Sequence, residues 1–409
     1  MTGLYLRIAP FFICMTMPAI VSEDFIHSVI NECPHSCTLL FWGMYVKIHA
    51  DKPEIIQTVS FVYSRFVTFA RTRIDVVCCI QRSPGTGRRP VMLLDGVLYE
   101  LPDSERFIGH ADLILFRHLL EQLTEFAVLH AAVVTRNNRA LVIYGQSGFG
   151  KTTLALELVR RGYGFMSDEF CSIRLSDFMI EPFERRVGLK PSSPFFGRID
   201  NAHLRYLASE DKYFFDCSDI FACGVARPCK PAAFIEITAA IDADVCPPGG
   251  VVIDICMCVG SSDTVLSALE SLPGVTLSQP LYKGSFTTYR VTAQDRQFFL
   301  NRFNRIWIDN SREIFSIYPY RGEIETYDRT PVLRTVPPFN ALTSIFANIV
   351  NRAPTGRLLA AHGGKTAPLI MRLGDALKES VCYSLQPGQL AKTADLIDNL
   401  AKTDDKPVV

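Results

Sequence analysis

The sequence predicts a mixed α/β (α+β) protein, in which a core built around a glycine-rich loop follows a small α+β domain and precedes a helical extension. Three observations predict this fold class. The segment GQSGFGKT, at 145–152, joins an expected strand to an expected helix. Aromatic and β-branched runs fill 41–82. Apolar residues recur at helical spacing in 342–350 and 390–400.

The composition indicates a globular chain without a dominant charge. Of the 409 residues, 48% are hydrophobic, and 42 Lys and Arg balance 42 Asp and Glu. A chain of this length can bury a large core and form about two or three folding units. Because the formal net charge is +0, no global field would recruit nucleic acid, and we expect no nucleic-acid partner.

The cysteines indicate neither disulfide bonds nor a metal site, and the apolar stretch near the beginning of the chain does not indicate a membrane span. The 13 cysteines are scattered through apolar stretches, so we expect reduced thiols in the core. The nearest metal-like motif, Cys33-Pro-His-Ser-Cys37, supplies one half-site without a matching pair downstream. The apolar stretch 8–21 contains two prolines and is too short to span a bilayer, so we expect a cytoplasmic protein without a membrane span.

The region before the core is expected to form a small α+β domain over 41–125, and the segment 1–40 is left unassigned. Asp95-Gly96 lies between two apolar runs and predicts a hairpin. Apolar residues at three- and four-residue steps predict a helix over 111–126.

The core domain is expected over 126–321. The predicted elements are strands at 129–134 and 140–144, the glycine-rich loop, a helix at 152–161, a strand at 163–167, loops with short strands over 178–219, and strands in PAAFIEITAA and GVVIDICMCVG. Gly162 follows the basic end of the expected helix, as helix stops often do. We expect the remaining segment, 322–409, to be an α-rich extension.

The glycine-rich loop has the pattern of a site for a nucleotide polyphosphate. A strand, a glycine-rich turn and a helix that begins near Lys151 would aim backbone N–H groups at one point, where the helix dipole also favours negative charge. Lys151 would bridge the β and γ phosphates, and the Thr152 hydroxyl would ligate Mg²⁺. The expected nucleotide-binding residues are Gly145, Gln146, Ser147, Gly148, Phe149, Gly150, Lys151, Thr152 and Thr153.

An acid pair, Asp168 and Glu169, follows Thr152 by one expected helix and one expected strand. In transporter ATPases and small GTPases the corresponding acid lies much farther downstream, so the short spacing favours a kinase. One carboxylate would hold Mg²⁺ and the other would take the proton from an attacking hydroxyl. We expect Asp168 to be the base and Glu169 the metal ligand. Because neighbours on a strand alternate faces, the reverse assignment stays open, with Asp168 on the metal.

The series LHAAVV, GQSGFGKT and LALELVRRGYGFMSDE resembles the catalytic domain of HPr kinase/phosphorylase, whose P-loop is of the phosphoenolpyruvate-carboxykinase type. The resemblance is close over Leu129 to Arg174. It implies that 145–152 binds ATP and Mg²⁺, that Asp168 is the general base, and that His130 lies near the phosphates and takes part in catalysis. It also implies a protein or peptide acceptor that carries a serine, and it allows for a homo-oligomer.

The chain departs from that family after the acid pair. Where the family carries Glu-x-Arg-Gly-Leu-Gly, this chain has Glu184-Arg-Arg-Val-Gly-Leu-Lys190, similar in composition but out of register. Arg185, Arg186 and Lys190 could contact phosphate or an acidic acceptor, since guanidinium groups hold phosphoryl oxygens well. A solvated basic turn is the alternative. In either case we expect Arg185→Ala and Arg186→Ala to change stability by no more than roughly 0.5 kcal/mol.

The sequence is therefore compatible with three functions. The first is an ATP-dependent, HPr-kinase-like enzyme that phosphorylates a serine of a protein or peptide. The second is a P-loop kinase of a small metabolite, which can also place an acid one strand after the loop. The third is a nucleotide-binding regulator with little turnover.

Overall fold

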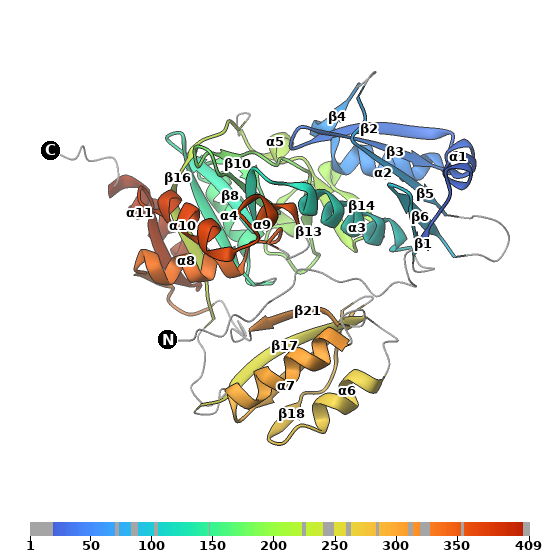
Figure 1. Cartoon of the computed structure of the whole chain (residues 1–409). Coiled ribbons are helices and arrows are strands. Elements are labelled where there is room, and N and C mark those ends of the chain that lie inside the picture. Colours follow the sequence, from blue (N-terminus) through green and yellow to red (C-terminus); the bar gives the residue numbers. More distant parts are fainter. Residues whose placement is uncertain are drawn as a thin grey trace.

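The computed structural model describes residues 19–69, 73–82, 89–101, 105–146, 148–222, 226–239, 249–258, 263–283, 286–309, 314–319, 328–352 and 356–403. These residues form a mixed α/β structure, as the sequence predicts (Figure 1). Within the described ranges, no helix combines the length and the apolar character that crossing a bilayer requires. The first 18 residues, which include most of the apolar stretch 8–21, lie outside the description.

The N-terminal unit is a seven-stranded sheet with the order β1-β7-β6-β5-β3-β2-β4. Its elements are β1 (Ala19–Ile20), α1 (Glu23–Asn31), β2 (His35–Phe41), β3 (Met44–Ala50), α2 (Pro53–Val62), η1 (Ser64–Phe66), β4 (Val67–Thr68), β5 (Val76–Gln81), β6 (Val91–Leu94), β7 (Val97–Glu100) and α3 (Phe107–Gln122). The β6–β7 hairpin turns at Asp95 and Gly96, as predicted, both with positive φ. Because β1 and β2 belong to this sheet, the expected boundary at residue 40 does not hold.

The core is an eight-stranded sheet with the order β12-β11-β8-β9-β16-β23-β22, in which β10 also pairs with β8. Its strands are β8 (Phe126–Arg136), β9 (Arg139–Gly145), β10 (Gly164–Ser167), β11 (Phe170–Arg174), β12 (Ile180–Glu181), β16 (Lys230–Ile237), β22 (Val332–Thr335) and β23 (Val381–Gln386). Strands β9, β16 and β23 run parallel, and Gly145 pairs with Ile237, which pairs with Leu385. The carboxyl ends of these three strands therefore meet at one edge of the sheet.

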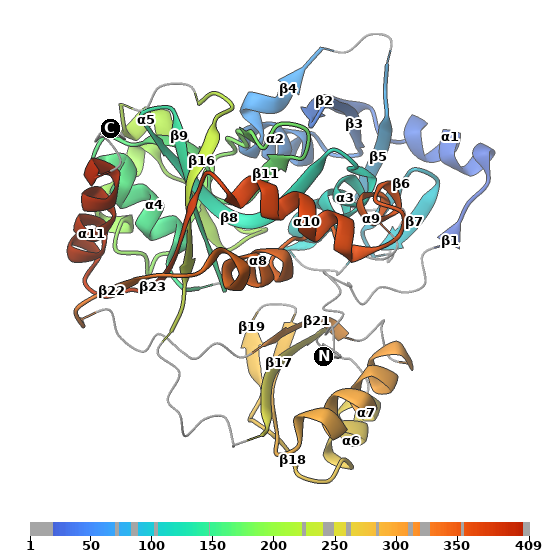
Figure 2. The same cartoon turned by 60° about the vertical axis from the view of Figure 1, so that its left-hand side comes forward.

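Helices cover both faces of this sheet (Figure 2). Alternate residues of β8 and β9 pack on α4 (Lys151–Arg160) and α11 (Leu390–Thr403) on one face. The other residues of the same strands pack on α8 (Pro338–Ala347), α9 (Arg357–Ala361) and α10 (Thr366–Leu377). A sheet covered on both faces has apolar side chains in both directions, which explains the continuous apolar runs in β8 and β9.

The predicted loops with short strands over 178–219 are present. They contain β13 (Val187–Leu189), η2 (Phe196–Arg198), η3 (Asn201–His203), β14 (Arg205–Leu207), β15 (Lys212–Phe215) and α5 (Cys217–Ile220). The three strands form a small sheet in the order β13-β15-β14. Phe214 on β15 packs in the core of the N-terminal unit, whereas Phe215 packs in the core beside α4. This small sheet therefore connects the two units.

The segment 249–319 forms a unit with its own hydrophobic core, which corrects the single domain expected over 126–321 (Figure 1). Its elements are β17 (Val251–Cys258), α6 (Asp263–Glu270), β18 (Val275–Leu277), β19 (Leu281–Lys283), β20 (Phe286–Ala293), α7 (Arg296–Asp309) and β21 (Ile314–Pro319). The strand order β18-β20-β17-β21 and the two helices give a ferredoxin-like βαββαβ arrangement. The expected strands in PAAFIEITAA and GVVIDICMCVG are β16 and β17, but they lie in different sheets.

The last segment is part of the core, so the α-rich extension expected over 322–409 is also corrected. Strands β22 and β23 extend the core sheet beside β16. Arg161, at the end of α4, forms ion pairs with Asp395 at 2.7 Å and Asp398 at 2.9 Å on α11. The amphipathic helices were predicted from their spacing, but strand pairing with a segment more than 140 residues away leaves no local pattern.

Candidate functional site

The glycine-rich loop connects β9 to α4 at the edge where the parallel strands end. Gly145 lies so close to β16 that a Cβ there would come within 2.6 Å of the Ile237 carbonyl oxygen. Gly148 and Gly150 have φ of 89° and 87°, a left-handed conformation that favours glycine. Gly150 is the N-cap of α4, and its helix has no side-chain cap hydrogen bond. The first turn of α4 therefore presents backbone N–H groups suited to an anion.

Lys151 lies folded against this loop. Its Nζ donates hydrogen bonds to the Gly145 carbonyl oxygen at 2.9 Å and to the Gln146 carbonyl oxygen at 3.3 Å. Burial lowers the pKa of Lys151 to about 8, although Glu169 and Asp168 act in the opposite direction. A buried ammonium group that donates to carbonyl groups would gain from an additional, anionic partner.

The other residues that are expected to bind the nucleotide lie around the same turn. Phe149 is buried in the core beside α4 and anchors the loop. Thr152 and Thr153 are half-buried in the first turn of α4. The side-chain Oε1 of Gln146 is buried and has no hydrogen-bond partner among the described residues. Ser147 lies outside the described residues.

The acid pair lies between two short strands that pair with the same neighbouring strand. Both β10 and β11 pair antiparallel with β8, so they follow one another along it and are separated at Asp168 and Glu169. The Ser167 hydroxyl accepts hydrogen bonds from the N–H groups of Glu169 at 3.1 Å and Phe170 at 3.0 Å, which fixes the irregular turn. The register shift of β10 on β8 lies just before the pair, between Phe165 and Ser167. Both carboxylates of the pair reach the same arginine.

Arg185 is that arginine. Its Nη2 donates to Glu169 Oε2 at 2.8 Å, and its Nε lies 4.0 Å from Asp168 Oδ1. Glu169 Oε1 in turn lies 3.5 Å from Nδ1 of His130, which projects from β8 opposite Phe170. His130, Glu169, Arg185 and Asp168 thus form one continuous cluster, in which His130 lies against Glu169.

The pKa values of the two carboxyl groups are shifted in opposite directions. Burial raises the pKa of Asp168 above its usual value, and Arg185 only partly opposes this effect. Burial would also raise the pKa of Glu169, but Arg185 and His130 outweigh it and hold that pKa well below its usual value. Burial and Lys151 lower the pKa of His130 to about 4, so its ring is neutral at pH 7. Glu169 is therefore the firmly ionised member, and Asp168 is the more basic one.

The remaining basic residues of the turn do not face the acid pair. Arg186 donates through Nε to the Phe61 carbonyl oxygen at 2.8 Å, and its guanidinium lies 4.3 Å from the centre of the Phe61 ring. Lys190 is exposed. Arg185 is only 8% exposed, so the interpretation of this turn as a solvated basic loop is wrong for Arg185.

The burial of Arg185 changes the stability expected for its variants. Arg185→Ala would leave two buried carboxylates without their cation, which typically costs about 3–5 kcal/mol. We expect a loss of this order in the free energy of unfolding at pH 7, measured by urea denaturation. Lys190→Ala, an exposed change on the same turn, should stay within about 0.5 kcal/mol. A similarly small loss for Arg185→Ala would contradict the buried cluster.

Sequence reasoning missed two residues that approach the cluster from the N-terminal unit. The Tyr63 hydroxyl, just after α2, donates to the carboxylate of Asp112 on α3, at 2.8 Å from each oxygen. Burial and nearby Glu210 raise the pKa of Asp112 to about 7, whereas Arg185 opposes the increase. The sequence holds a signal for Asp112, which is an acidic residue within the apolar helix sequence 108–116. A carboxylate in such a helix is expected to be buried and therefore requires a polar or charged partner.

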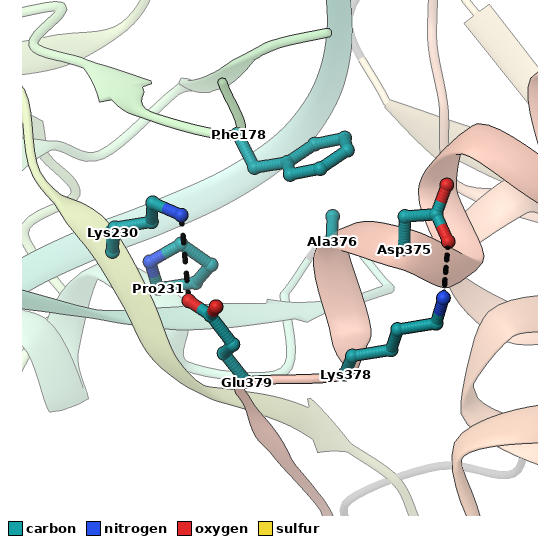
Figure 3. A pocket seen from close by; sticks show the side chains of 7 residues that line it. All are labelled: Phe178, Lys230, Pro231, Asp375, Ala376, Lys378 and Glu379. Atoms are coloured by element: carbon teal, nitrogen blue, oxygen red, sulfur yellow. Dashed lines mark hydrogen bonds and ion pairs between the residues drawn. The ribbon is translucent and has the colours of Figure 1, made fainter. Parts of the chain in front are cut away.

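A separate pocket lies at the opposite edge of the core sheet (Figure 3). Its volume is about 280 Å³, and it is lined by Phe178, Lys230, Pro231, Asp375, Ala376, Lys378 and Glu379. Lys230 pairs with Arg139, at the beginning of β9, whereas Ile237 pairs with Gly145, at its end. Seven strand residues, or about 23 Å, separate the two edges. The pocket is thus remote from the glycine-rich loop.

Comparisons with known proteins show that part of the chain is similar to HPr kinase/phosphorylase, which confirms the resemblance. It is 36% identical over 64 residues to HPr kinase/phosphorylase 1 of Oceanobacillus iheyensis, a match that covers 16% of this chain and 21% of that protein. It is 37% identical over 60 residues to HPr kinase/phosphorylase of Clostridium botulinum strain Eklund 17B, covering 15% and 20%. The chain therefore spans about a fifth of the length of these curated relatives.

A comparison with solved structures also gives a match. The Hpr(Ser) kinase/phosphatase of Coxiella burnetii is 14% identical, with 29% of this chain and 67% of that chain covered. Its TM-score of 0.19 is too low to support a fold assignment. No family model matches the chain.

Proposed function

We propose that the protein is an ATP-dependent kinase with a P-loop core of the HPr-kinase and phosphoenolpyruvate-carboxykinase type, which phosphorylates a serine of a protein or peptide. The observation that supports this proposal most is the joint placement of the loop lysine and the acid pair. The Glu169 carbonyl oxygen accepts from the Ala131 N–H at 3.2 Å, Ala131 pairs with Tyr144, and the next residue, Gly145, accepts from Lys151 Nζ at 2.9 Å. A cation for phosphate and a basic carboxylate thus occur in one site, as phosphoryl transfer to a hydroxyl requires.

The residues of the loop fit a nucleotide polyphosphate. Gly148 and Gly150 let the backbone approach phosphate closely, and the first turn of α4 offers its N–H groups. Lys151 would turn from the loop carbonyl groups to the β and γ phosphates. Thr152 would hold Mg²⁺, which neutralises charge on the phosphates when bound. Glu169 is engaged by Arg185 and His130, which makes it less suited to bind the metal than the sequence suggests.

Asp168 is the group best suited to take the acceptor's proton. Its raised pKa makes it a stronger base than an ordinary carboxylate. Within the part of the chain that the structure describes, its Oδ1 has no hydrogen-bond partner, whereas Glu169 Oε2 accepts from Arg185. Asp168 would accept the hydroxyl proton as the serine oxygen attacks the γ-phosphorus, and Lys151 would stabilise the negative charge on the transferred group. The alternative is that Asp168 only binds the metal and Glu169 is the base. The variants Asp168→Asn and Glu169→Gln distinguish the two assignments.

The names of the relatives refer to HPr, a protein substrate, and we infer a protein or peptide acceptor for this chain on that basis. The experiment is incubation with γ-³²P-labelled ATP and a cell extract, followed by separation of proteins from small molecules. Label in the protein fraction as alkali-labile phosphoserine would support the proposal. Label in a small metabolite would identify a metabolite kinase instead. ATP binding without transfer would identify a nucleotide-binding regulator.

The rate of transfer should depend on pH through Asp168. A general base must be ionised, and burial raises the pKa of Asp168 above its ordinary 3.8. We therefore expect kcat/KM to fall about tenfold per pH unit on the acidic limb, with a midpoint well above 3.8. A pH–rate profile checks this expectation. A profile that is flat from pH 8 down to pH 4 would contradict the role of Asp168 as base.

A further inference from the structure

The pocket at the beginning of β16, with a volume of about 280 Å³, is formed by three segments that are distant in the sequence (Figure 3). They are the turn between β11 and β12, the first residues of β16, and the connection from α10 to β23. Arg139 Nη2 donates to the Pro231 carbonyl oxygen at 3.0 Å and to the Glu379 carbonyl oxygen at 2.8 Å. The Ser380 hydroxyl donates to the same Pro231 oxygen at 3.2 Å. These bonds make the pocket a fixed feature of the core sheet.

Phe178 lines this pocket with a backbone conformation that is unfavourable for a bulky residue. Its φ is 61°, in the left-handed region that glycine and asparagine adopt at lower cost. Arg372 holds the turn, because its Nε donates to the Leu175 carbonyl oxygen at 2.8 Å and its guanidinium lies 5.1 Å from the centre of the Phe178 ring. Strained residues of this kind cluster at ligand sites, and this turn presents an aromatic ring to the pocket.

Strand β16 has a second irregularity at the same pocket. Its register on β9 shifts between Pro231 and Ala233, so Ala232 is an extra residue. Pro231, which lines the pocket, has no N–H to donate, and its carbonyl oxygen accepts from Arg139 and from Ser380. Bulges are frequent beside functional sites, where they redirect side chains. Two separate departures from regular structure thus line one cavity.

The charged side chains of the pocket balance one another. Lys230 forms an ion pair with Glu379 at 3.4 Å, and Lys378 forms one with Asp375 at 2.7 Å. Figure 3 shows the first pair on one side of the pocket and the second pair on the other, with the Phe178 ring between them. The four side chains are 42% to 75% exposed. Exposed ion pairs are weak, so these pairs can open for a ligand.

We propose that this pocket binds a small zwitterion, namely an amino acid or a short peptide with a free ammonium and a free carboxylate group. An anion would face Asp375 and Glu379, a cation would face the two lysines, and an uncharged apolar molecule would displace water from all four charges. A zwitterion satisfies both signs and places its apolar part against Phe178 and Pro231. Such binding would not require the proposed kinase activity, because the pocket is remote from the glycine-rich loop.

The two charged groups of the ligand take different places. Asp375 lies in the last turn of α10, where the helix dipole also favours a positive charge, so the ammonium group belongs there. Lys230, at the beginning of β16, holds the carboxylate. A second pocket of about 590 Å³ adjoins the first, since Lys230 and Glu379 line both. It leaves room for a ligand longer than one amino acid.

Isothermal titration of the whole protein with the common L-amino acids and a set of dipeptides tests this site. We expect a Kd on the order of 1 mM or below for a ligand of roughly ten heavy atoms. Binding of single amino acids, or of dipeptides alone, decides between the two sources. Each compound that binds is titrated again as its C-terminal amide, which lacks the carboxylate, and as its N-acetyl form, which lacks the ammonium group. Each derivative should bind at least about tenfold more weakly, because one charge-assisted contact is lost.

Variants of the pocket locate the two groups. Lys230→Gln should weaken binding of the zwitterion about tenfold but leave binding of the amide unchanged, because the amide has no carboxylate to lose. Asp375→Asn should weaken the zwitterion equally and leave the N-acetyl form unchanged. Phe178→Asn removes the ring, tolerates the positive φ, and should weaken every form. Lys392→Gln, an exposed change on α11, is the matched control and should bind like the parent.

Absence of binding by every amino acid and dipeptide up to about 10 mM would overturn the proposal. Equal affinity of the parent for a zwitterion and both of its derivatives would overturn it too, and this comparison needs no variant to fold. Lys151→Ala, in the glycine-rich loop, should bind the zwitterion like the parent. Loss of binding in that folded variant would place the ligand at the loop and contradict a site beside Phe178. Failure of phosphoryl transfer would refute the proposed function and leave all of these outcomes unchanged.

Discussion

Lys151→Ala should abolish most ATP binding while the protein remains folded. The lysine contributes a buried positive charge at the end of the glycine-rich loop, and among the described residues its hydrogen bonds go to two carbonyl oxygens of that loop. Bound phosphates would replace these weak partners with charge-assisted hydrogen bonds, which are roughly twice as strong. Isothermal titration with ATP, with and without Mg²⁺, measures the change. We expect the affinity to fall at least about a hundredfold, the loss of roughly two charge-assisted bonds.

The control for this variant is Lys378→Ala, which removes an exposed lysine at the end of α10. It should bind ATP like the parent. Thermal denaturation of both variants separates binding from folding. Unchanged ATP affinity in a folded Lys151→Ala protein would remove the loop from the proposed mechanism.

Asp168→Asn should leave ATP binding intact and slow transfer by about 10²–10⁴-fold, the usual contribution of a positioned general base. Asparagine keeps the size of the side chain and part of its hydrogen bonding, but it cannot accept the proton. The substitution also removes a carboxylate whose ionisation is disfavoured by burial, so the fold should tolerate it. Single-turnover transfer at saturating ATP measures the chemical step separately from binding.

Glu169→Gln provides the comparison that distinguishes the two carboxylates. The variant loses the charged partner of Arg185, so it should slow transfer without any rescue by Mg²⁺. Full transfer in both variants would exclude the acid pair from the mechanism. An Asp168→Asn protein that high Mg²⁺ restores, beside an inactive Glu169→Gln protein, would make Asp168 the metal ligand and Glu169 the base.

The local parts of the fold and site could be predicted from the sequence. The strand before the loop, the glycines at 145, 148 and 150, and helix α4 depend on neighbouring residues, and all three are found close to their expected positions. The nearness of Asp168 to Lys151 also followed from a short connection of one helix and one strand. These features are encoded within about thirty residues, where periodicity and turn chemistry are informative.

The parts that depend on distant residues could not be predicted. Strand β23 pairs with β16 across an inserted unit that has its own core, and one sequence without pairing information does not reveal such an insertion. Arg185 is adjacent to Arg186 and looks equivalent to it, yet one is buried against the acid pair and the other lies on Phe61. Which of Asp168 and Glu169 is the base stays open from the sequence, and both carboxylates reach Arg185, which lies 16 residues beyond Glu169.

Quantitative mass spectrometry of phosphoserine tests the central claim most directly, that this site transfers the γ-phosphoryl group of ATP to a protein or peptide serine. Dephosphorylated cell extract is incubated with γ-¹⁸O-labelled ATP and either the parent protein or Asp168→Asn. The account predicts heavy phosphate on defined serine residues with the parent and a loss of at least about a hundredfold with the variant. Equal labelling with both proteins, or an ATP-binding parent that labels no polypeptide, would contradict it.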